Sequence, residues 1–252
     1  MTAPAYKESR RAFLQRNPFV CPRTLGFFYR EKMRAIHQIA PDLPFVDILE
    51  VGGGQSGLTR LLYPRAQVVN LDLDPSFADA PCNSAEGVRF VCGDATALVF
   101  PDGSFDAVTM FDLLEHVPEH ERAISEAFRV LRPGGWLLVT TPNENWQFPY
   151  YRALRRFCPD EPEMMAEWGH VRRGYSLAEM RELMGVPCQG HATFITPLTV
   201  LCHDVSFCRA RHDVRRAICV ALAPLTLFGY AVHRPSGRGT ERASGWQKPA
   251  LG

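Results

Sequence analysis

Apolar residues along this chain follow two alternating patterns, short continuous runs and helical spacings. Five runs rich in β-branched and aromatic residues predict strands over residues 45–51, 66–72, 88–92, 105–111 and 135–141. Three- and four-residue spacing predicts helices over 24–40 and 58–62, and another that ends at Pro133-Gly134-Gly135. Strands and helices that alternate in this way indicate a mainly parallel sheet with helices on both faces.

The C-terminal part of the chain contains a long uncharged stretch, residues 217–232. It is shorter than the ~20 apolar residues of a membrane span, and Pro224 and Gly229 interrupt it. We therefore predict a buried helix over 213–222, a strand over 228–233 and no stable membrane insertion. Residues from Pro235 onward are rich in Gly, Ser and Arg, which predicts a flexible tail.

Composition and charge narrow the functional classes. The apolar fraction of 46% and the charged fraction of 22% are those of an ordinary globular domain, and the net charge of +1 does not indicate a nucleic-acid partner. The basic residues are nearly all arginine, with lysine only at positions 7, 32 and 248, which we attribute to genomic composition. The eight cysteines form no CxxC pair and the N-terminus has no apolar signal core, so we predict a cytoplasmic protein with reduced thiols.

A glycine cluster, Glu50-Val-Gly-Gly-Gly-Gln-Ser-Gly57, joins the first predicted strand to a helix. Glycine lets the backbone turn tightly and approach a ligand, although loops of this kind bind several nucleotide cofactors. Asp72 ends the next strand, where a carboxylate can accept both ribose hydroxyls of an adenosine. Asp94 follows the third strand and can accept from an adenine amino group. Each aspartate alone also fits a turn or a helix cap, but the three features together indicate one ligand site at the carboxyl ends of the strands.

At this point the sequence resembles the class I methyltransferases that depend on S-adenosylmethionine (SAM), in particular the type 11 small-molecule branch. The matching blocks are Ile48-Leu-Glu-Val-Gly-Gly-Gly54, Leu71-Asp-Leu-Asp-Pro75, Gly93-Asp-Ala-Thr-Ala-Leu98, Phe100-Pro-Asp-Gly-Ser-Phe-Asp106, Phe111-Asp-Leu-Leu-Glu-His-Val117 and Arg129-Val-Leu-Arg-Pro-Gly-Gly135. They run from about residue 46 to 143 in the family's order and spacing. The stretch Gly169-His-Val-Arg-Arg-Gly-Tyr-Ser-Leu177 is a weaker match.

The resemblance implies a role for each residue of the site. Glu50 and the loop Gly52, Gly53 and Gly54 would hold the methionine end of SAM. Asp72 would hold the ribose, and the remaining contacts would come from Leu73, Asp94 and Ala95 around the adenine and from Phe111 and Asp112 beneath the sulfonium. The sequence departs from the family at Ser56, where glycine is usual, and this makes a contact from Ser56 to the SAM carboxylate possible.

The resemblance also implies a single Rossmann-like, doubly wound α/β domain with a seven-stranded sheet. The candidates for the last two strands are 190–195 and 228–233. We divide the chain into an N-terminal helical lid (1–44), a SAM-binding core (45–143), an acceptor-pocket insertion with a helix (144–188), the last two strands with an intervening helix (189–234) and the flexible tail (235–252).

Methyl transfer from a sulfonium mainly requires alignment of acceptor, methyl group and sulfur, and a hydroxyl or amine acceptor can also need a base. His116 is the candidate base; the alternative is that it only packs or forms a hydrogen bond within the fold. Trp146, Tyr150 and Tyr151 either stack on an acceptor or belong to the core. Arg172 and Arg173 either bind an anionic group or are solvated. No metal site has suitable spacing.

The predicted function is transfer of a methyl group from SAM to a small-molecule acceptor, with an oxygen of a glycan, a lipid-linked intermediate or a secondary metabolite as the expected target. Two alternatives remain open on sequence alone. A nicotinamide-dependent Rossmann oxidoreductase would share the glycine loop and Asp72 but not the Gly93-Asp-Ala95 block. A catalytically silent interaction protein would have no need of all the cofactor residues. The oligomeric state cannot be deduced from the sequence.

Overall fold

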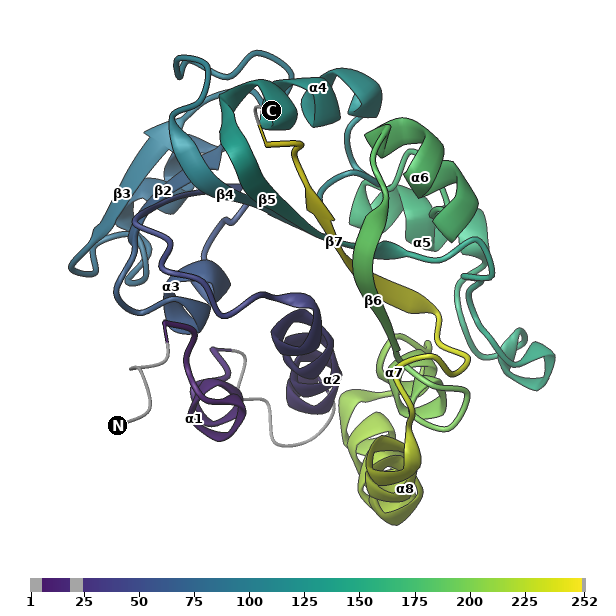
Figure 1. Ribbon diagram of the computed structural model, residues 1–252. Coiled ribbons are helices and arrows are strands. Elements are labelled where there is room, and N and C mark those ends of the chain that lie inside the picture. The colour runs from purple at the N-terminus through teal and green to yellow at the C-terminus, as the bar shows by residue number, and fades with distance from the viewer. Residues whose placement is uncertain (1–5, 19–24, 251–252) are drawn as a thin grey trace.

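The computed structural model describes residues 6–18 and 25–250. A seven-stranded sheet lies at its centre (Figure 1). The strands are β1 (Asp47–Val51), β2 (Gln67–Asp72), β3 (Val88–Cys92), β4 (Phe105–Phe111), β5 (Leu131–Pro142), β6 (Cys188–Phe194) and β7 (Glu241–Gln247). Their order is β3-β2-β1-β4-β5-β7-β6, and β7 runs antiparallel to both of its neighbours. The predicted doubly wound α/β fold with a mainly parallel sheet is confirmed.

Helices cover both faces of the sheet, as predicted. Alternate strand residues point to opposite faces, so that Ile48 packs into one apolar core and Leu49 into the other. The first core lies under α1 (Arg10–Gln15), α2 (Leu25–Ile39) and α3 (Leu58–Leu62), and the second under α4 (His120–Val130) and α6 (Leu177–Met184). The remaining elements are η1 (Pro75–Asp79), η2 (Arg152–Leu154), α5 (Glu161–Trp168), α7 (Val200–Ser206) and α8 (His212–Val232).

The position of the seventh strand corrects the sequence prediction. The strand expected over 228–233 is wrong, because these residues belong to α8 and the turn that follows it, and the tail expected to be flexible contains β7 instead. Ala243 and Trp246 of β7 are fully buried between β5 and β6. The sequence Glu-Arg-Ala-Ser-Gly-Trp-Gln shows no apolar alternation, because small residues and backbone fill most of its buried positions. The predicted sixth strand, 190–195, is found as β6.

Helix α8 also differs from the prediction. It continues through Pro224 and Gly229 rather than ending before them, and it is mostly exposed; its buried residues are Cys219, Thr226 and Gly229. Among the described residues it is the one helix that is long and apolar enough, with a mean hydropathy of 1.3, to cross a membrane. The break in the apolar stretch that we predicted at Pro224 and Gly229 is therefore absent from the helix.

The N-terminal helix and the cysteines agree with the sequence as far as they are described. The predicted helix over 24–40 is α2; its predicted first residue, Thr24, lies outside the described residues, as does Cys21. The seven described cysteines are free thiols.

Candidate functional site

The residues proposed for the site come together at one edge of the sheet. Each lies at or just after the carboxyl end of β1, β2, β3 or β4, and these four strands are parallel neighbours. Ligands of open α/β sheets bind at this edge because the loops that leave the strands leave a crevice there.

The glycine loop after β1 needs glycine for two separate reasons. Gly52 and Gly54 have φ values of +70° and +51°, in the left-handed region that disfavours other residues. Gly53 has an ordinary backbone, but a Cβ there would collide with the side chain of Asn70. The departure at Ser56 is followed by Gly57, which has φ +59° and is the N-cap residue of α3. Ser56 accepts a long hydrogen bond, 3.5 Å, from the Leu58 amide, and its side chain also forms a hydrogen bond with the Glu50 carboxyl that partly opposes the effect of burial on the pKa of Glu50.

Two asparagines that the sequence analysis missed fix the shape of this loop. The amide of Asn70 donates to the Gly54 carbonyl at 3.1 Å and to the side-chain oxygen of Asn83 at 2.6 Å. Asn83 donates to the same Gly54 carbonyl at 2.9 Å and to Phe77 at 2.8 Å. Both side chains are buried. A polar residue inside an otherwise apolar strand, as Asn70 is in β2, was the available signal.

Glu50 lies in the interior behind the glycine loop. It is 2% exposed, and its carboxylate accepts a long hydrogen bond of 3.4 Å from the Thr59 amide. Burial raises the pKa of Glu50 to about 7. A cationic group next to this carboxyl would stabilise its ionised form, which is what an amino-acid ammonium group would do.

Asp72 and Asp94 end neighbouring strands, as predicted. One oxygen of Asp72 accepts from the Gly54 amide at 3.0 Å and the other from the Asp74 amide at 3.1 Å, so each keeps a second lone pair. One oxygen of Asp94 accepts from the amide and hydroxyl of Thr96, and these hydrogen bonds lower its pKa. Leu73 is 74% exposed beside them, an unusual environment for a leucine, whereas Ala95 is buried.

Asp112 lies under the centre of the crevice, in a strained conformation. Its φ is +50°, which is uncommon for a residue with a side chain, and this turns the chain sharply after Phe111. Its carboxylate accepts from the Thr140 hydroxyl at 2.5 Å and forms an ion pair with the ammonium of Lys32 on α2. Burial disfavours the charged forms of both residues, but the opposite charge of the partner outweighs this effect. The pKa of Asp112 is therefore lowered and that of Lys32 is raised.

Lys32 is a functional candidate that the sequence analysis missed. Its side chain is 5% exposed, and it reaches the site from a helix that precedes the glycine loop by 12 residues or more. The rarity of lysine in this arginine-rich chain was the signal that could have found it.

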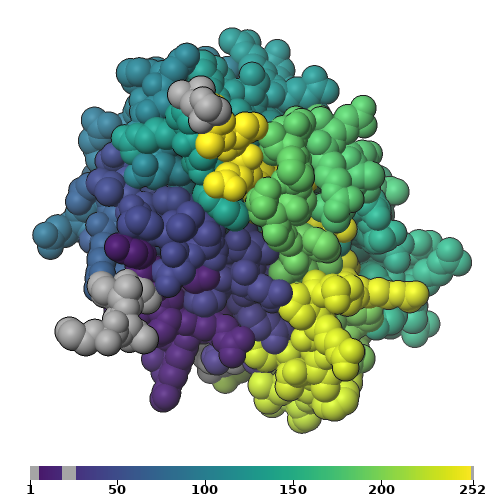
Figure 2. Space-filling model, viewed as in Figure 1, coloured from purple at the N-terminus to yellow at the C-terminus, as the bar shows by residue number. Residues whose placement is uncertain are grey.

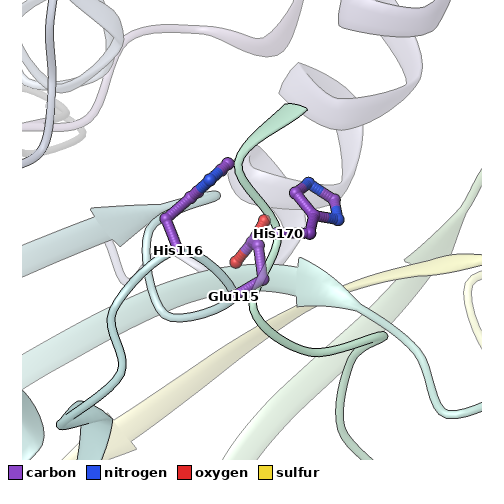
Figure 3. Close-up of side chains that lie close together, drawn as sticks. All are labelled: Glu115, His116 and His170. Atoms are coloured by element: carbon purple, nitrogen blue, oxygen red, sulfur yellow. The ribbon is translucent and has the colours of Figure 1, made fainter. Parts of the chain in front are cut away.

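Next to Asp112, three titratable side chains converge from two loops. Glu115 and His116 follow β4, and His170 follows α5; Figure 3 shows them side by side. One ligand-type atom from each lies within 4.8 Å of the others. Glu115 is 1% exposed and one of its oxygens lacks a hydrogen-bond partner, as does the Nδ1 atom of His170.

The protonation of this cluster follows from burial and from Asp112. Burial first, and then the charge of Asp112, raise the pKa of Glu115 well above its usual range. Burial lowers the pKa of His170 to about 4, so its ring is neutral at pH 7. Glu241 of β7, also buried close by, has its pKa raised well above the usual range by burial and by Asp112. Burial therefore favours the neutral forms of Glu115, Glu241 and His170 around the ion pair of Asp112 and Lys32.

Near this cluster, on the other side of a contact between Trp146 and His170, is a polar cavity of about 770 Å³ that none of the three cluster residues lines. Trp146 lines the cavity and its ring centroid lies 5.7 Å from that of His170, which in turn lies 4.8 Å from that of His116. Four arginines line it, Arg155, Arg173, Arg238 and Arg242, together with Glu144 and Glu161. The Nε atom of Arg242 and the side-chain oxygen of Asn143, both at this cavity, lack partners.

Not every residue considered for the acceptor side faces this cavity. Arg172 donates to the carbonyls of Leu114, Val117 and Pro118, so it ties the loop after β4 in place. Arg173 lines the cavity and forms an ion pair with Glu161. Trp146 is buried, Tyr150 lines the cavity, and Tyr151 donates to the Pro197 carbonyl at 2.6 Å.

Comparison with known proteins identifies the central part of the chain. Residues 49–139 match the family model of a methyltransferase domain, type 11. The chain is 40% identical over 99 residues to a demethylmenaquinone methyltransferase of Thermus thermophilus, covering 36% of this chain and 45% of that protein. It is 30% identical over 138 residues to a ubiquinone biosynthesis O-methyltransferase of Coxiella burnetii, covering 49% of this chain and 59% of that protein. The chain thus spans about half the length of these curated relatives.

The fold agrees with these matches. A solved S-adenosylmethionine-dependent methyltransferase from Mesorhizobium loti superimposes with a TM-score of 0.57 at 17% identity, over 84% of this chain and 95% of that one. The nicotinamide-dependent oxidoreductase that the glycine loop left open is set aside by the family match. The central part of the chain, residues 49–139, therefore matches a type 11 methyltransferase domain, and the fold around it agrees with that match.

Proposed function

We propose that this protein transfers a methyl group from SAM to an oxygen of a small-molecule acceptor in the cytoplasm. The proposal rests on two groups of residues that lie side by side at one edge of the sheet. The nucleoside-type group lies along β1 to β3, and the group with proton-accepting side chains lies after β4, with the Asp112–Lys32 ion pair between them.

The residues at the sheet edge fit SAM. Asp72 keeps free lone pairs for two ribose hydroxyls, and the carboxyl of Glu50 is buried behind the glycine loop, where an ammonium group would stabilise its ionised form. Leu73 offers an exposed apolar surface for the adenine, flanked by Ala95 and by the free oxygen of Asp94. Ser56 would donate to the amino-acid carboxylate of SAM in place of its hydrogen bond with Glu50. When bound, SAM supplies an electrophilic methyl group on a sulfonium.

His116 is proposed as the base because its hydrogen bond fixes its tautomer. Its Nδ1 atom lies 3.1 Å from the Gly169 carbonyl, which can only accept, so Nδ1 carries the proton and Nε2 has the lone pair. Nε2 of His116 would accept the hydroxyl proton of the acceptor when the acceptor oxygen takes the methyl group and the thioether product is released. The ion pair of Lys32 and Asp112 keeps the floor of the site electrically neutral.

The acceptor is proposed to be a hydroxyl compound that also carries a phosphate or carboxylate. The arginines at the nearby cavity, in particular Arg155 and Arg238, offer the guanidinium groups that bind such anions. Glycans, lipid-linked intermediates and secondary metabolites all include compounds of this kind. The relatives are named for steps of quinone biosynthesis, and acceptors of that size also fit a 770 Å³ cavity.

We further propose that the reaction needs no metal ion. Glu115, His116 and His170 are residue types that bind metals and lie close together, but transfer of a methyl group from a sulfonium mainly needs alignment rather than a Lewis acid. Turnover after treatment with EDTA should equal that of untreated enzyme. A loss that Zn²⁺ or Mg²⁺ restores would make the cluster a metal site instead.

Binding is tested first, by thermal shift and calorimetry with SAM and its demethylated product. Saturation at a hundredfold excess over Kd should stabilise the protein by about 2.7 kcal/mol. Asp72→Ala should weaken SAM binding by ~1.5–3 kcal/mol, since charge-assisted hydrogen bonds to two hydroxyls are lost. Asp79→Ala, on the exposed end of η1, is the control. The proposal fails if SAM gives neither heat nor a shift.

Catalysis is tested with labelled SAM and metabolites fractionated by anion exchange. Label should enter a retained, anionic fraction, and Arg155→Gln should raise the KM for that acceptor while leaving SAM affinity unchanged. Label found only in unretained compounds would reject the anionic acceptor but keep methyl transfer.

The role of His116 is tested with two variants. His116→Ala and His116→Gln should both lower turnover at saturating SAM, by ~10²–10⁴. Glutamine can still donate to the Gly169 carbonyl, so it preserves a structural role but cannot accept the proton. Normal turnover in the glutamine variant would therefore remove His116 as the base; His191→Ala, on the exposed side of β6, is the control.

A further inference from the structure

The outer face of α8 is apolar along most of its length. From residue 217 to 232 the exposed positions are all apolar: Ala217, Ile218, Val220, Ala221, Pro224, Leu225, Leu227, Phe228, Ala231 and Val232. Leu227, Phe228 and Val220 are 53%, 59% and 60% exposed. Soluble helices normally turn such residues inward. In Figures 1 and 2, α8 lies at the edge of the molecule farthest from α4 and β3.

The charges around α8 are predominantly positive. Residues 207–240 contain six arginines and one aspartate, a formal charge of +5, whereas the whole chain has +1, so that the remainder carries −4. Arg211 pairs with Asp213, and Arg209 pairs with Glu163 outside this segment. Arg216 and Arg234, near the two ends of the helix, are exposed and form no ion pair within the described part of the chain.

We propose that α8 docks on the surface of an anionic phospholipid bilayer, lying in the plane of the interface. The apolar side chains would enter the boundary between headgroups and acyl chains, and the arginines at both ends would meet lipid phosphates. A second copy of the chain is a poorer occupant of this face, because it would bring two segments of charge +5 together.

An in-plane helix fits the contacts of α8 better than a membrane-spanning one. Its opposite face packs on the domain through Cys219, Thr226 and Gly229, and a span would have to break these contacts. The main-chain carbonyl of Tyr230 accepts from Arg34 of α2 at 2.6 Å, and the guanidinium lies 3.9 Å from the Tyr230 ring centroid. Both ends of α8 return to the same domain, through α7 and β7.

The attachment to α2 connects the membrane surface to the site. The same helix carries Arg34, which holds α8, and Lys32, which pairs with Asp112. A bilayer bound at the outer face of α8 would therefore be connected through α8 to the helix that carries Lys32. The docking inference itself does not depend on the proposed reaction.

The test is flotation with phosphatidylcholine vesicles that contain or lack phosphatidylglycerol. Wild-type protein should float with the anionic vesicles and be released as salt is raised. The double variant Leu227→Glu/Phe228→Glu should lower the partition constant at least about a hundredfold, because each side chain contributes roughly tenfold or more. Arg216→Gln/Arg234→Gln should bind anionic vesicles less and should lose most of the salt dependence.

The matched control is Val46→Glu/Val99→Glu, which places two charges at exposed valines outside α8. It should float like wild type, and every variant should keep the thermal shift with SAM, which shows that it is folded. The proposal is overturned if wild type binds neither kind of vesicle. It is also overturned if the control variant loses as much vesicle binding as the Leu227→Glu/Phe228→Glu variant. It is also overturned if the wild-type protein is a dimer that does not bind vesicles and the Leu227→Glu/Phe228→Glu variant is a monomer.

Discussion

At the residue scale, the three lysines of this arginine-rich chain have specialised positions. The ammonium of Lys7 donates to carbonyls at the end of α2, and that of Lys248 to carbonyls at the end of α4. Lys32 forms the ion pair with Asp112. A compact ammonium reaches two converging oxygens in places where a planar guanidinium would not fit. Composition bias accounts for the arginines but not for these lysines.

Lys32→Met should destabilise the protein by about 3 kcal/mol, because it leaves Asp112 charged without its partner. The value lies at the low end for a broken buried pair, since the Asp112 side chain is 32% exposed. Adding Asp112→Asn should recover most of the loss, and urea unfolding of the single and double variants measures this. Additive losses in the double variant would show that the two charges do not interact.

Glu50→Gln should separate stability from cofactor binding. The pKa of Glu50 is raised to about 7 in the folded protein, so the folded state binds a proton that the unfolded chain has released between pH 4.5 and 7. Stability from this group is present at low pH and is lost as pH rises through 7. The free energy of unfolding of the glutamine variant should therefore exceed that of wild type by roughly 2–4 kcal/mol at pH 8. At pH 4.5 the two proteins should be equally stable. Melting temperatures at the two pH values provide the measurement.

The same variant should bind SAM more weakly by calorimetry, because the amide cannot pair with the ammonium group. A variant that melts like wild type at pH 8 would mean that Glu50 is already compensated in the free protein.

At the element scale, β7 should be essential although its sequence is inconspicuous. Trp246 is fully buried in the core on the side of α4 and α6. Trp246→Ala should cost about 3–5 kcal/mol, from lost burial and from the cavity that remains. Gln189→Ala, at an exposed position of β6, should change stability by less than about 0.5 kcal/mol. Chemical unfolding of both variants provides the measurement, and similar losses would show that β7 is dispensable.

The sequence was informative wherever one face of an element is apolar. Strands β3 and β4 match their predicted bounds, 88–92 and 105–111, because their apolar runs end at clear turn residues. It failed where packing overrides local preference. Residues 228–232 have strand-like composition but continue α8, whose packing contacts extend through Gly229 to Tyr230. Likewise, β7 is held by pairing with β5 and β6, which no local pattern encodes.

The site shows the same division. The residues proposed for the cofactor lie at the strand ends where the motifs predicted them, because a strand end dictates their position. Lys32, Asn70 and Glu241 were not found, because each reaches the site from a segment without a motif, and only the tertiary fold shows that their side chains are buried.

At the scale of the whole molecule, the histidines make the fold sensitive to acid. Burial is the main cause that lowers the pKa of five of them, His37, His120, His170, His191 and His233. Below pH 6.5 the unfolded chain binds protons that the folded protein excludes, so stability is complete above that pH and is lost as pH falls.

For His170 alone, with a pKa of about 4, the loss between pH 6.5 and 4 should be on the order of 1–2 kcal/mol, allowing for its partly exposed ring. The melting temperature should fall over this range, and His170→Gln should make the fall shallower. A melting temperature that is constant from pH 6.5 to 4.5 would contradict the assignment.

The place of β7 in the sheet also has a consequence for biosynthesis. Strand β6 pairs only with β7, and Cys188 meets Trp246, 58 positions later in the chain. The separation along the chain is larger for strand β5, whose residue Trp136 pairs with Gln247 of β7. On the ribosome, the edges of β5 and β6 thus stay open until the last of these strands has emerged, and α8 with its apolar face is translated before it. Open strand edges and exposed apolar helices are the surfaces that chaperones bind and that aggregate. A nascent chain stalled before residue 241 would therefore be a substrate for quality control, even though its cofactor loops are already complete.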